Sequence, residues 1–89
     1  MNISKDGLIN YKPSTSATVV LVSGELGSSE VSIGYMSPED VFVPFRGSEV
    51  LGVGEQYYIS HGNNVELILE TTGSDSATNV GIIFSAVSS

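Results

Sequence analysis

Short apolar segments alternate with clusters of glycine, serine, asparagine and acidic residues along most of the chain. The turn clusters recur about every eight to twelve residues, a spacing typical of an all-β sandwich or small barrel. No apolar pattern keeps the period of a helix for more than about one turn. We therefore predict an all-β fold, a small antiparallel β-sandwich or barrel of about six to seven strands.

Two kinds of strand pattern are present. Residues 18–22 are apolar or β-branched without interruption, which is typical of a strand buried on both faces. Residues 80–87 form another apolar segment and are predicted to be the last strand. Residues 30–35 and 65–70 instead show the period-two alternation of a half-buried strand.

The alternation in residues 65–70 predicts which side chains face the core. Glu66 and Glu70 are expected to point to solvent, because a shift by one residue would bury both carboxylates. Ile68 shares their face, so it is either an apolar residue simply exposed to solvent or part of a subunit contact, and we favour the contact. The side chains predicted to face the core are Val65, Leu67 and Leu69, opposite either Val31, Ile33 and Tyr35 or the strand over residues 80–84.

Aromatic residues occur in two further strand segments. Residues 41–45 follow a Ser-Pro-acid-acid turn, and Pro44 marks an edge or a bulge because proline cannot donate to a sheet ladder. In residues 55–60, the adjacent Tyr57 and Tyr58 must face opposite sides of the sheet. One tyrosine is therefore expected in the core, and the other on the surface, where it can stack on a sugar or anchor an interface.

The N-terminal segment differs in composition from the rest of the chain. Residues 1–16 are rich in polar residues and contain Pro13, and only residues 8–11 have the apolar character of a strand. We predict an extended polar arm over residues 1–16, with room for one short edge strand. Residues 17–89 are predicted to form a single β-sandwich domain.

Charges are distributed unevenly along the chain, whose formal net charge is −7. The arm holds two lysines and one acid, whereas the remaining residues hold nine acids and a single base, Arg46. This shortage of cations argues against nucleic-acid binding through phosphates and against attraction to an anionic membrane. No stretch of about 20 apolar residues is present to span a bilayer. The expected partners therefore include neither nucleic acid nor a membrane.

Few residues are suited to catalysis or metal binding. The chain has no cysteine, which excludes disulfides, thiolate chemistry and cysteine-based zinc sites. The one histidine, His61, lies in a His-Gly-Asn-Asn turn, and no serine has the Gly-x-Ser-x-Gly setting of an activated nucleophile. We predict a protein that is not an enzyme, with no catalytic residues, no cofactor and no metal site.

A chain of 89 residues forms only a thin hydrophobic core. Domains of this size commonly gain stability from disulfides, metals or neighbouring subunits, and the sequence offers nothing for the first two. The hydrophobic content of 40% therefore favours a homo-oligomer in which apolar strand faces meet.

From residue 17 to the C-terminus, the order of features resembles a known class of protein. An apolar strand with a glycine-rich turn (17–27) precedes an alternating strand (30–35), then a Ser-Pro-acid-acid turn with an aromatic strand (37–45). A small-residue stretch, a penultimate strand and an apolar last strand follow. This order resembles that of small β-sandwich virion proteins of tailed bacteriophages, including capsid decoration or cement proteins.

The resemblance implies a virion structural protein on the capsid surface, synthesised in the host cytoplasm. Its partner would be the major capsid protein, and this protein would bind the shell as a homotrimer and stabilise it. The arm could add a strand to a sheet edge of a shell protein. The residues expected at capsid attachment are Lys5, Leu8, Ile9, Tyr11 and Lys12, and those expected at a subunit or ligand contact are Phe42, Tyr58 and Ile68.

Two other classes stay open. A carbohydrate-binding or adhesin-tip module would use exposed aromatic residues such as Tyr58 or Phe42 to stack on sugars. An enzyme accessory domain is the other class, although no residue of the chain points to it. Binding to glycans would separate the first class from a decoration protein.

Overall fold

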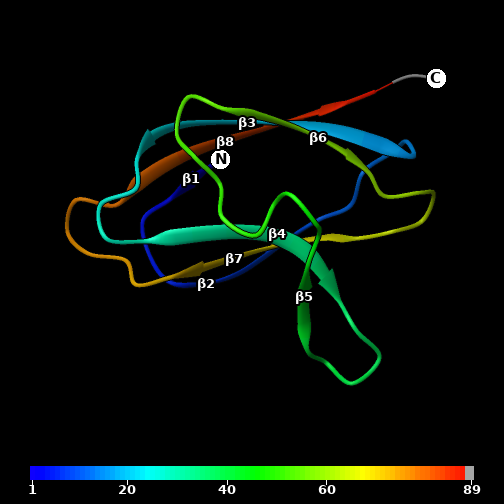
Figure 1. Ribbon diagram of the computed structural model, residues 1–89, viewed down its shortest axis with the longest axis horizontal. Helices are drawn as coiled ribbons and strands as arrows, with labels where there is room; N and C mark the ends of the chain where they lie inside the picture. The colour runs from blue at the N-terminus through cyan, green and yellow to red at the C-terminus, as the bar shows by residue number, and fades with distance from the viewer. Residues whose placement is uncertain (88–89) are drawn as a thin grey trace.

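Two antiparallel sheets of four strands lie face to face in the computed structural model, which describes residues 1–87 (Figure 1). Sheet A has the strand order β1-β8-β3-β6, and sheet B has the order β2-β7-β4-β5. The predicted all-β sandwich is confirmed, with eight strands where about six to seven were expected. The strands of sheet A are β1 (Asn2–Ile3), β8 (Asn79–Ala86), β3 (Ala17–Glu25) and β6 (Gln56–Ser60), and those of sheet B are β2 (Gly7–Tyr11), β7 (Leu67–Thr72), β4 (Glu30–Met36) and β5 (Phe42–Pro44).

Residues 1–87 contain no helix with the length and apolar character needed to cross a membrane.

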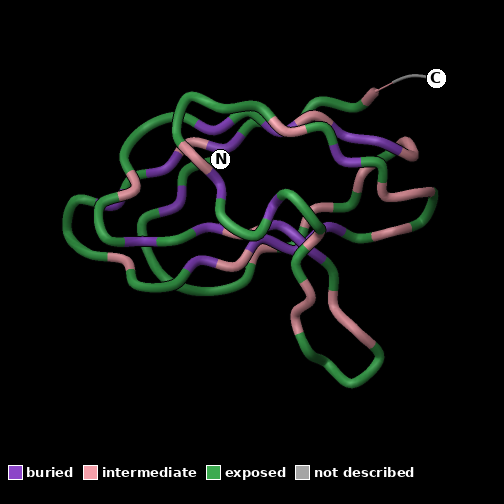
Figure 2. Tube along the Cα trace, in the orientation of Figure 1, coloured by how far each residue is buried: buried purple, intermediate pink, exposed green. Residues whose placement is uncertain are grey.

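The hydrophobic core lies between the two sheets. Figure 2 shows buried positions alternating with exposed ones along the strands of both layers, as a half-buried strand requires. Leu67 and Leu69 are fully buried, and Leu69 pairs with Ile33, as the alternation of these strands predicts. The same alternation predicted Tyr35 in the core, but its side chain is 39% exposed and packs against Phe45. The buried core side chains are Ile3, Val20, Val22, Val31, Ile33, Leu51, Ile59, Leu67, Leu69, Val80 and Ile82.

The connection between β5 and β6 closes one edge of this core. Leu51 lies in it with no exposed surface, and its N–H donates to the carbonyl of Val31 at 2.8 Å. The N–H of Ile33 likewise donates to the carbonyl of Ser48 at 3.0 Å. This connection therefore replaces β5 alongside the first half of β4, although it is not a regular strand.

Strand β3 is buried on one face only, which corrects the prediction of two-sided burial for residues 18–22. Val20 and Val22 lie in the core, but Leu21 is 38% exposed. Its neighbour on β8, Ile83, is 56% exposed. The reason is that a two-layer sandwich has no third layer to cover the outer face of sheet A.

The N-terminal residues lie within the sandwich rather than extending from it as the expected arm. Strand β1 pairs with β8, and β2 pairs along its whole length with β7, so both are edge strands. Ile3 is only 3% exposed, and the ring of Tyr11 stacks on that of Phe84 with centroids 4.0 Å apart. Alternate apolar residues of this segment thus help to fill the core.

The β4–β5 hairpin bends outward from sheet B and projects away from the two layers (Figure 1). A Cβ atom on Gly34 would lie 2.6 Å from the Cα of Pro44, and closer still to the carbonyl of Val43. Only glycine therefore allows β5 to approach β4 at this point. Pro44 lies in an edge strand, as its missing N–H predicts.

Ile68 is buried, which corrects the prediction that it shares an exposed face with Glu66 and Glu70. It is the cross-strand neighbour of Gly34, over which the Val43–Pro44 backbone passes, and only 2% of its surface is exposed. Strand β7 is therefore buried on both faces at this position. A hairpin folding back over a glycine could not be read from the alternation of β7 itself.

Removing the buried side chain of β1 should show whether the N-terminal residues stabilise the fold. We expect Ile3→Ala to lower the free energy of unfolding by about 2 to 5 kcal/mol, because it leaves a cavity in the core. Leu8→Ala, at a side chain that is 49% exposed, should cost no more than about 1 kcal/mol. Urea unfolding of the two variants measures both values, and equal small losses would mean that the segment contributes little to stability.

Candidate functional site

The outer face of sheet A carries a group of exposed apolar side chains. Tyr58 is 65% exposed and Ile83 is 56% exposed, and between them lie Val19 and Leu21 of β3. Val19 pairs with Tyr58, and Leu21 pairs with Ile83, so the four side chains are neighbours across three adjacent strands. We call these four residues the apolar face.

No charged side chain interrupts the apolar face. The remaining cross-strand neighbours on this side are Gln56, opposite Leu21, and Ser85, opposite Val19, and both are neutral. The outer face of sheet B is different, because Glu30, Glu66 and Glu70 are on it. The sandwich therefore has one neutral apolar face and one acidic face.

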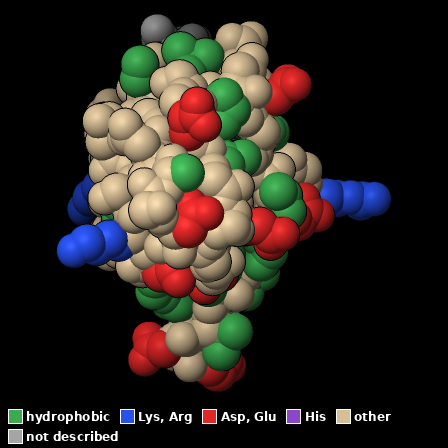
Figure 3. Space-filling model, turned by 90° about the vertical axis from the view of Figure 1, so that its left-hand side faces the viewer, with side chains coloured by type: hydrophobic (Ala, Val, Ile, Leu, Met, Phe, Trp, Pro, Cys, Tyr) green, Lys and Arg blue, Asp and Glu red, His purple; other side chains and the backbone are tan. Residues whose placement is uncertain are grey.

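Acidic side chains also lie at one end of the sandwich. Figure 3 shows the end with the β3–β4 and β7–β8 turns, where acidic groups are scattered among neutral ones and lysine or arginine appears only at the sides. Because the formal net charge is −7, a neutral patch is the part of this surface that a partner can approach with least repulsion from like charges.

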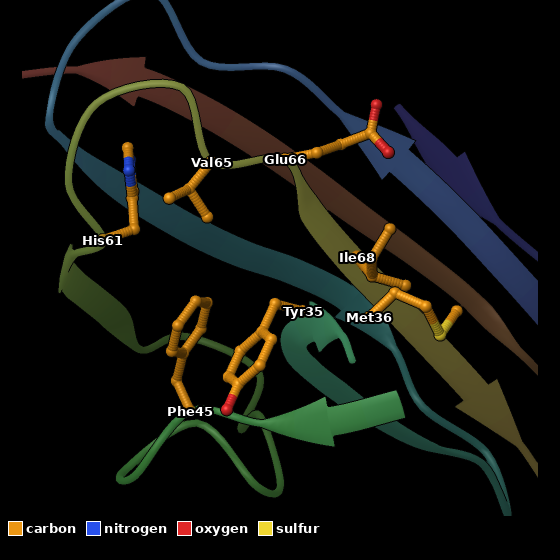
Figure 4. Close-up of a pocket in the computed structure, with 7 residues that line it drawn as sticks. All are labelled: Tyr35, Met36, Phe45, His61, Val65, Glu66 and Ile68. Atoms are coloured by element: carbon orange, nitrogen blue, oxygen red, sulfur yellow. The ribbon is translucent and has the colours of Figure 1, made fainter. Parts of the chain in front are cut away.

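A pocket lies at the other end of the sandwich, where the turn after β6 crosses from sheet A to sheet B (Figure 4). Its volume is about 470 Å³. The rings of Tyr35 and Phe45 form one wall, with centroids 5.5 Å apart and planes inclined at 43°. The remaining lining residues are Met36, His61, Val65, Glu66 and Ile68.

Two polar side chains of this pocket, His61 and Glu66, make hydrogen bonds within the protein. Nε2 of His61 lies 2.9 Å from the hydroxyl of the buried Thr18, and Nδ1 lies 2.7 Å from the carbonyl of Gly62. Oε1 of Glu66 accepts a hydrogen bond of 2.9 Å from the amide of Asn10. The pocket therefore offers mostly apolar and aromatic surface, and its histidine holds the turn in place.

The residues expected at capsid attachment do not form one surface. Ile9 and Tyr11 point inward and pack against the core, whereas Leu8 is exposed on the outer face of sheet B. Lys5 and Lys12 are exposed just before and just after β2. Alternation along a single edge strand separates these five side chains.

Of the residues expected at a subunit or ligand contact, Tyr58 alone belongs to the apolar face. Phe42 is half-buried in the short strand β5, and Ile68 is buried and lines the pocket. Sequence reasoning missed Val19, Leu21 and Ile83, because an uninterrupted apolar strand was interpreted as buried on both sides. In a two-layer sandwich, that uninterrupted pattern itself indicates an exposed apolar surface to which a partner can bind.

Two aspartates accept backbone hydrogen bonds that stabilise the turns at the end of the sandwich opposite the pocket. The carboxylate of Asp6 accepts hydrogen bonds from the N–H groups of Ser74, at 2.7 Å, and Gly73, at 3.2 Å. The hydrogen bonds from Ser74 chiefly lower the pKa of Asp6 below its ordinary value. The backbone N–H of Ala77 does the same for the pKa of Asp75. Asp6 thus ties the β1–β2 connection to the β7–β8 turn.

Within residues 1–87, no three histidine or acidic side chains come close enough together to hold a metal ion.

Neither a protein-family model, nor a curated protein, nor a solved structure matches this chain. The comparisons therefore assign no family, and the resemblance to phage virion proteins stays a prediction.

The link made by Asp6 should weaken in acid. Because the pKa of Asp6 is lowered in the folded state, its contribution to stability is present above the ordinary aspartate pKa of about 3.9 and is lost as the pH falls through the lower, folded-state value. We expect Asp6→Asn to lower the melting temperature at pH 7 and to make a smaller difference at about pH 2. Glu39→Gln, in the exposed β4–β5 turn, is the charge-matched control and should not lower the melting temperature at either pH.

Proposed function

We propose that this protein is a non-enzymatic structural protein of a phage virion, a capsid decoration protein that binds the outer surface of the shell and stabilises it. The apolar face of sheet A supports the proposal best. Its apolar side chains stand opposite an acidic face, so the two sides of one thin sandwich differ in the partner they can accept.

An exposed and uninterrupted apolar surface is what a binding protein needs on the side that docks. Scattered single apolar residues are normal on a monomer, whereas a contiguous group over adjacent strands marks an interaction site. Covering this group requires no desolvation of a charge, because its cross-strand neighbours are glutamine and serine.

The opposite face is suited to contact with water. Glu30, Glu66 and Glu70 keep the outer face of sheet B hydrated, which favours an orientation with sheet A toward the shell and sheet B toward solvent. An oligomer of this protein would hold the shell through several subunits at once, and such multivalent attachment strengthens weak individual contacts.

The titratable groups of the pocket support a role in binding rather than in catalysis. General acid–base chemistry needs a group that can reach the substrate, and both ring nitrogens of His61 are within hydrogen-bond distance of groups of the protein itself. A partner is therefore expected to be recognised by shape and apolar contact.

A charge placed on the apolar face tests the docking surface. We expect Ile83→Glu to weaken co-sedimentation with undecorated capsids from a panel of tailed phages by at least about tenfold, because burial of a carboxylate is costly. Leu8→Glu is the matched control on the outer face of sheet B, at a similarly exposed leucine, and should bind like the unaltered protein. Absence of binding to every capsid, or an equal loss for both variants, would contradict the proposal.

A carbohydrate-binding module is a second candidate, favoured by the aromatic wall of the pocket. The rings of Tyr35 and Phe45 form one wall of a cavity large enough for a sugar residue, and aromatic rings commonly stack on sugars. On a glycan array, this function predicts binding that Tyr35→Ala abolishes and Tyr58→Ala, outside the pocket, preserves. An array without any bound glycan would leave the decoration protein as the better proposal.

A further inference from the structure

Strand β6 is an edge strand without the features that normally prevent edge-to-edge pairing. Soluble proteins protect sheet edges with very short strands, with proline, with charged residues or with a covering segment. Here β6 consists of Gln56, Tyr57, Tyr58, Ile59 and Ser60, which includes no charged residue and no proline. It pairs with β3 on one side and is the last strand of sheet A on the other.

The other three edge strands of the sandwich are protected. Strand β1 has two residues and β5 has three, and β5 also contains Pro44. Strand β2 is flanked by Lys5 on one side and by Lys12 and Pro13 on the other. Among the four edge strands of the described structure, β6 alone is neither very short nor flanked by lysine or proline.

The hydrogen-bonding groups on the free side of β6 can be assigned from its pairing with β3. The N–H of His61 donates to the carbonyl of Ser16 at 3.1 Å, so odd-numbered residues of this segment direct their backbone groups toward β3. The N–H and C=O groups of Gln56, Tyr58 and Ser60 consequently point away from the sheet. All three residues are exposed.

We propose that β6 pairs with β6 of a second copy of this chain, antiparallel and centred on Tyr58, to join two sheets A into one continuous sheet. In this register Tyr58 lies opposite Tyr58 of the second copy, and Gln56 lies opposite Ser60. Every outward N–H of Gln56, Tyr58 and Ser60 then meets an outward carbonyl of the other copy, and every outward carbonyl meets an N–H. No backbone group of this edge is left without a partner.

Charge and apolar exposure both favour a second copy as the occupant. Glu55 is the acid adjoining β6, and the two-fold register places it opposite His61 of the second copy, so no two carboxylates face each other along the paired strands. The β5–β6 connection, which runs alongside β4 before it enters β6, exposes Val50, by 58%, and Val53, by 42%. Two-fold pairing brings the exposed Tyr58 side chains of the two copies together and so removes from water apolar surface that a monomer leaves exposed.

This contact is isologous and produces a dimer, whereas the trimer expected from the sequence would need two different complementary surfaces on each subunit. The pairing uses the edge of sheet A and leaves Ile83, two strands away from β6, free on the apolar face. The proposed dimer therefore does not depend on the proposed binding to a capsid, and an experiment can contradict one proposal without contradicting the other.

Single cysteines test the register, because the chain contains no cysteine of its own. Paired residues in antiparallel strands have Cα atoms about 5.5 Å apart, within the range that a disulfide bridges. We expect Tyr58→Cys to form a disulfide-linked dimer under mild oxidation, and Gln56→Cys alone to form none. A mixture of Gln56→Cys and Ser60→Cys should give the crosslinked heterodimer, because those positions are opposite each other.

Sedimentation velocity over micromolar to submillimolar concentrations tests the dimer itself. Gln56→Pro removes an outward N–H that β3 does not use, so it should weaken dimerisation at least about tenfold while the chain stays folded. Gln56→Ala keeps the N–H and should dimerise normally, as should Ile83→Lys. If Gln56→Pro fails to fold, the crosslinking of the cysteine variants still tests the β6–β6 pairing. A stable monomer, a trimer, or crosslinking that ignores these positions would overturn the inference.

Discussion

The pairing of β3 with β8 is the interaction on which the rest of the structure depends. Eight residue pairs join these strands, from Thr18 with Ala86 to Glu25 with Asn79. Strand β6 pairs with the other side of β3, and β1 pairs with the other side of β8, so sheet A cannot form without this ladder. Because the two strands lie far apart in sequence, their pairing must overcome a large loop-closure entropy, and uninterrupted apolar character on both strands offsets it.

The same apolar character creates the main surface feature of the molecule. Alternate residues of β3 and β8 fill the core, and the side chains of the residues between them point to the outer face of sheet A. Sheet B avoids this outcome in two ways, because its outer face carries glutamates and its one apolar central residue, Ile68, lies beside the β4–β5 hairpin that passes over Gly34. The apolar character of β3 and β8 therefore both stabilises sheet A and leaves an apolar face exposed for binding.

The N-terminal residues show how much a thin sandwich relies on its edges. Ile3 and Tyr11 reach the core from strands that are weakly apolar as segments, and Asp6 fixes the connection between them to the β7–β8 turn. A polar composition predicted an arm, since composition averages over a segment. Burial, however, is decided one residue at a time, and two or three alternate apolar side chains are enough to dock a strand.

The sequence by itself determined the all-β class, the strands from β3 to β8, the edge position of Pro44 and the inward direction of Leu67 and Leu69, because turn spacing and period-two alternation are local properties. Only the tertiary structure decided that Ile68 is buried, that Leu21 and Ile83 are exposed, and that β6 is an open edge. These depend on which strands are neighbours and on how many layers the fold has. The same apolar residue type can face the core, a neighbouring hairpin or solvent, and the sequence pattern is the same in all three cases. Only the arrangement of the sheets distinguishes these environments.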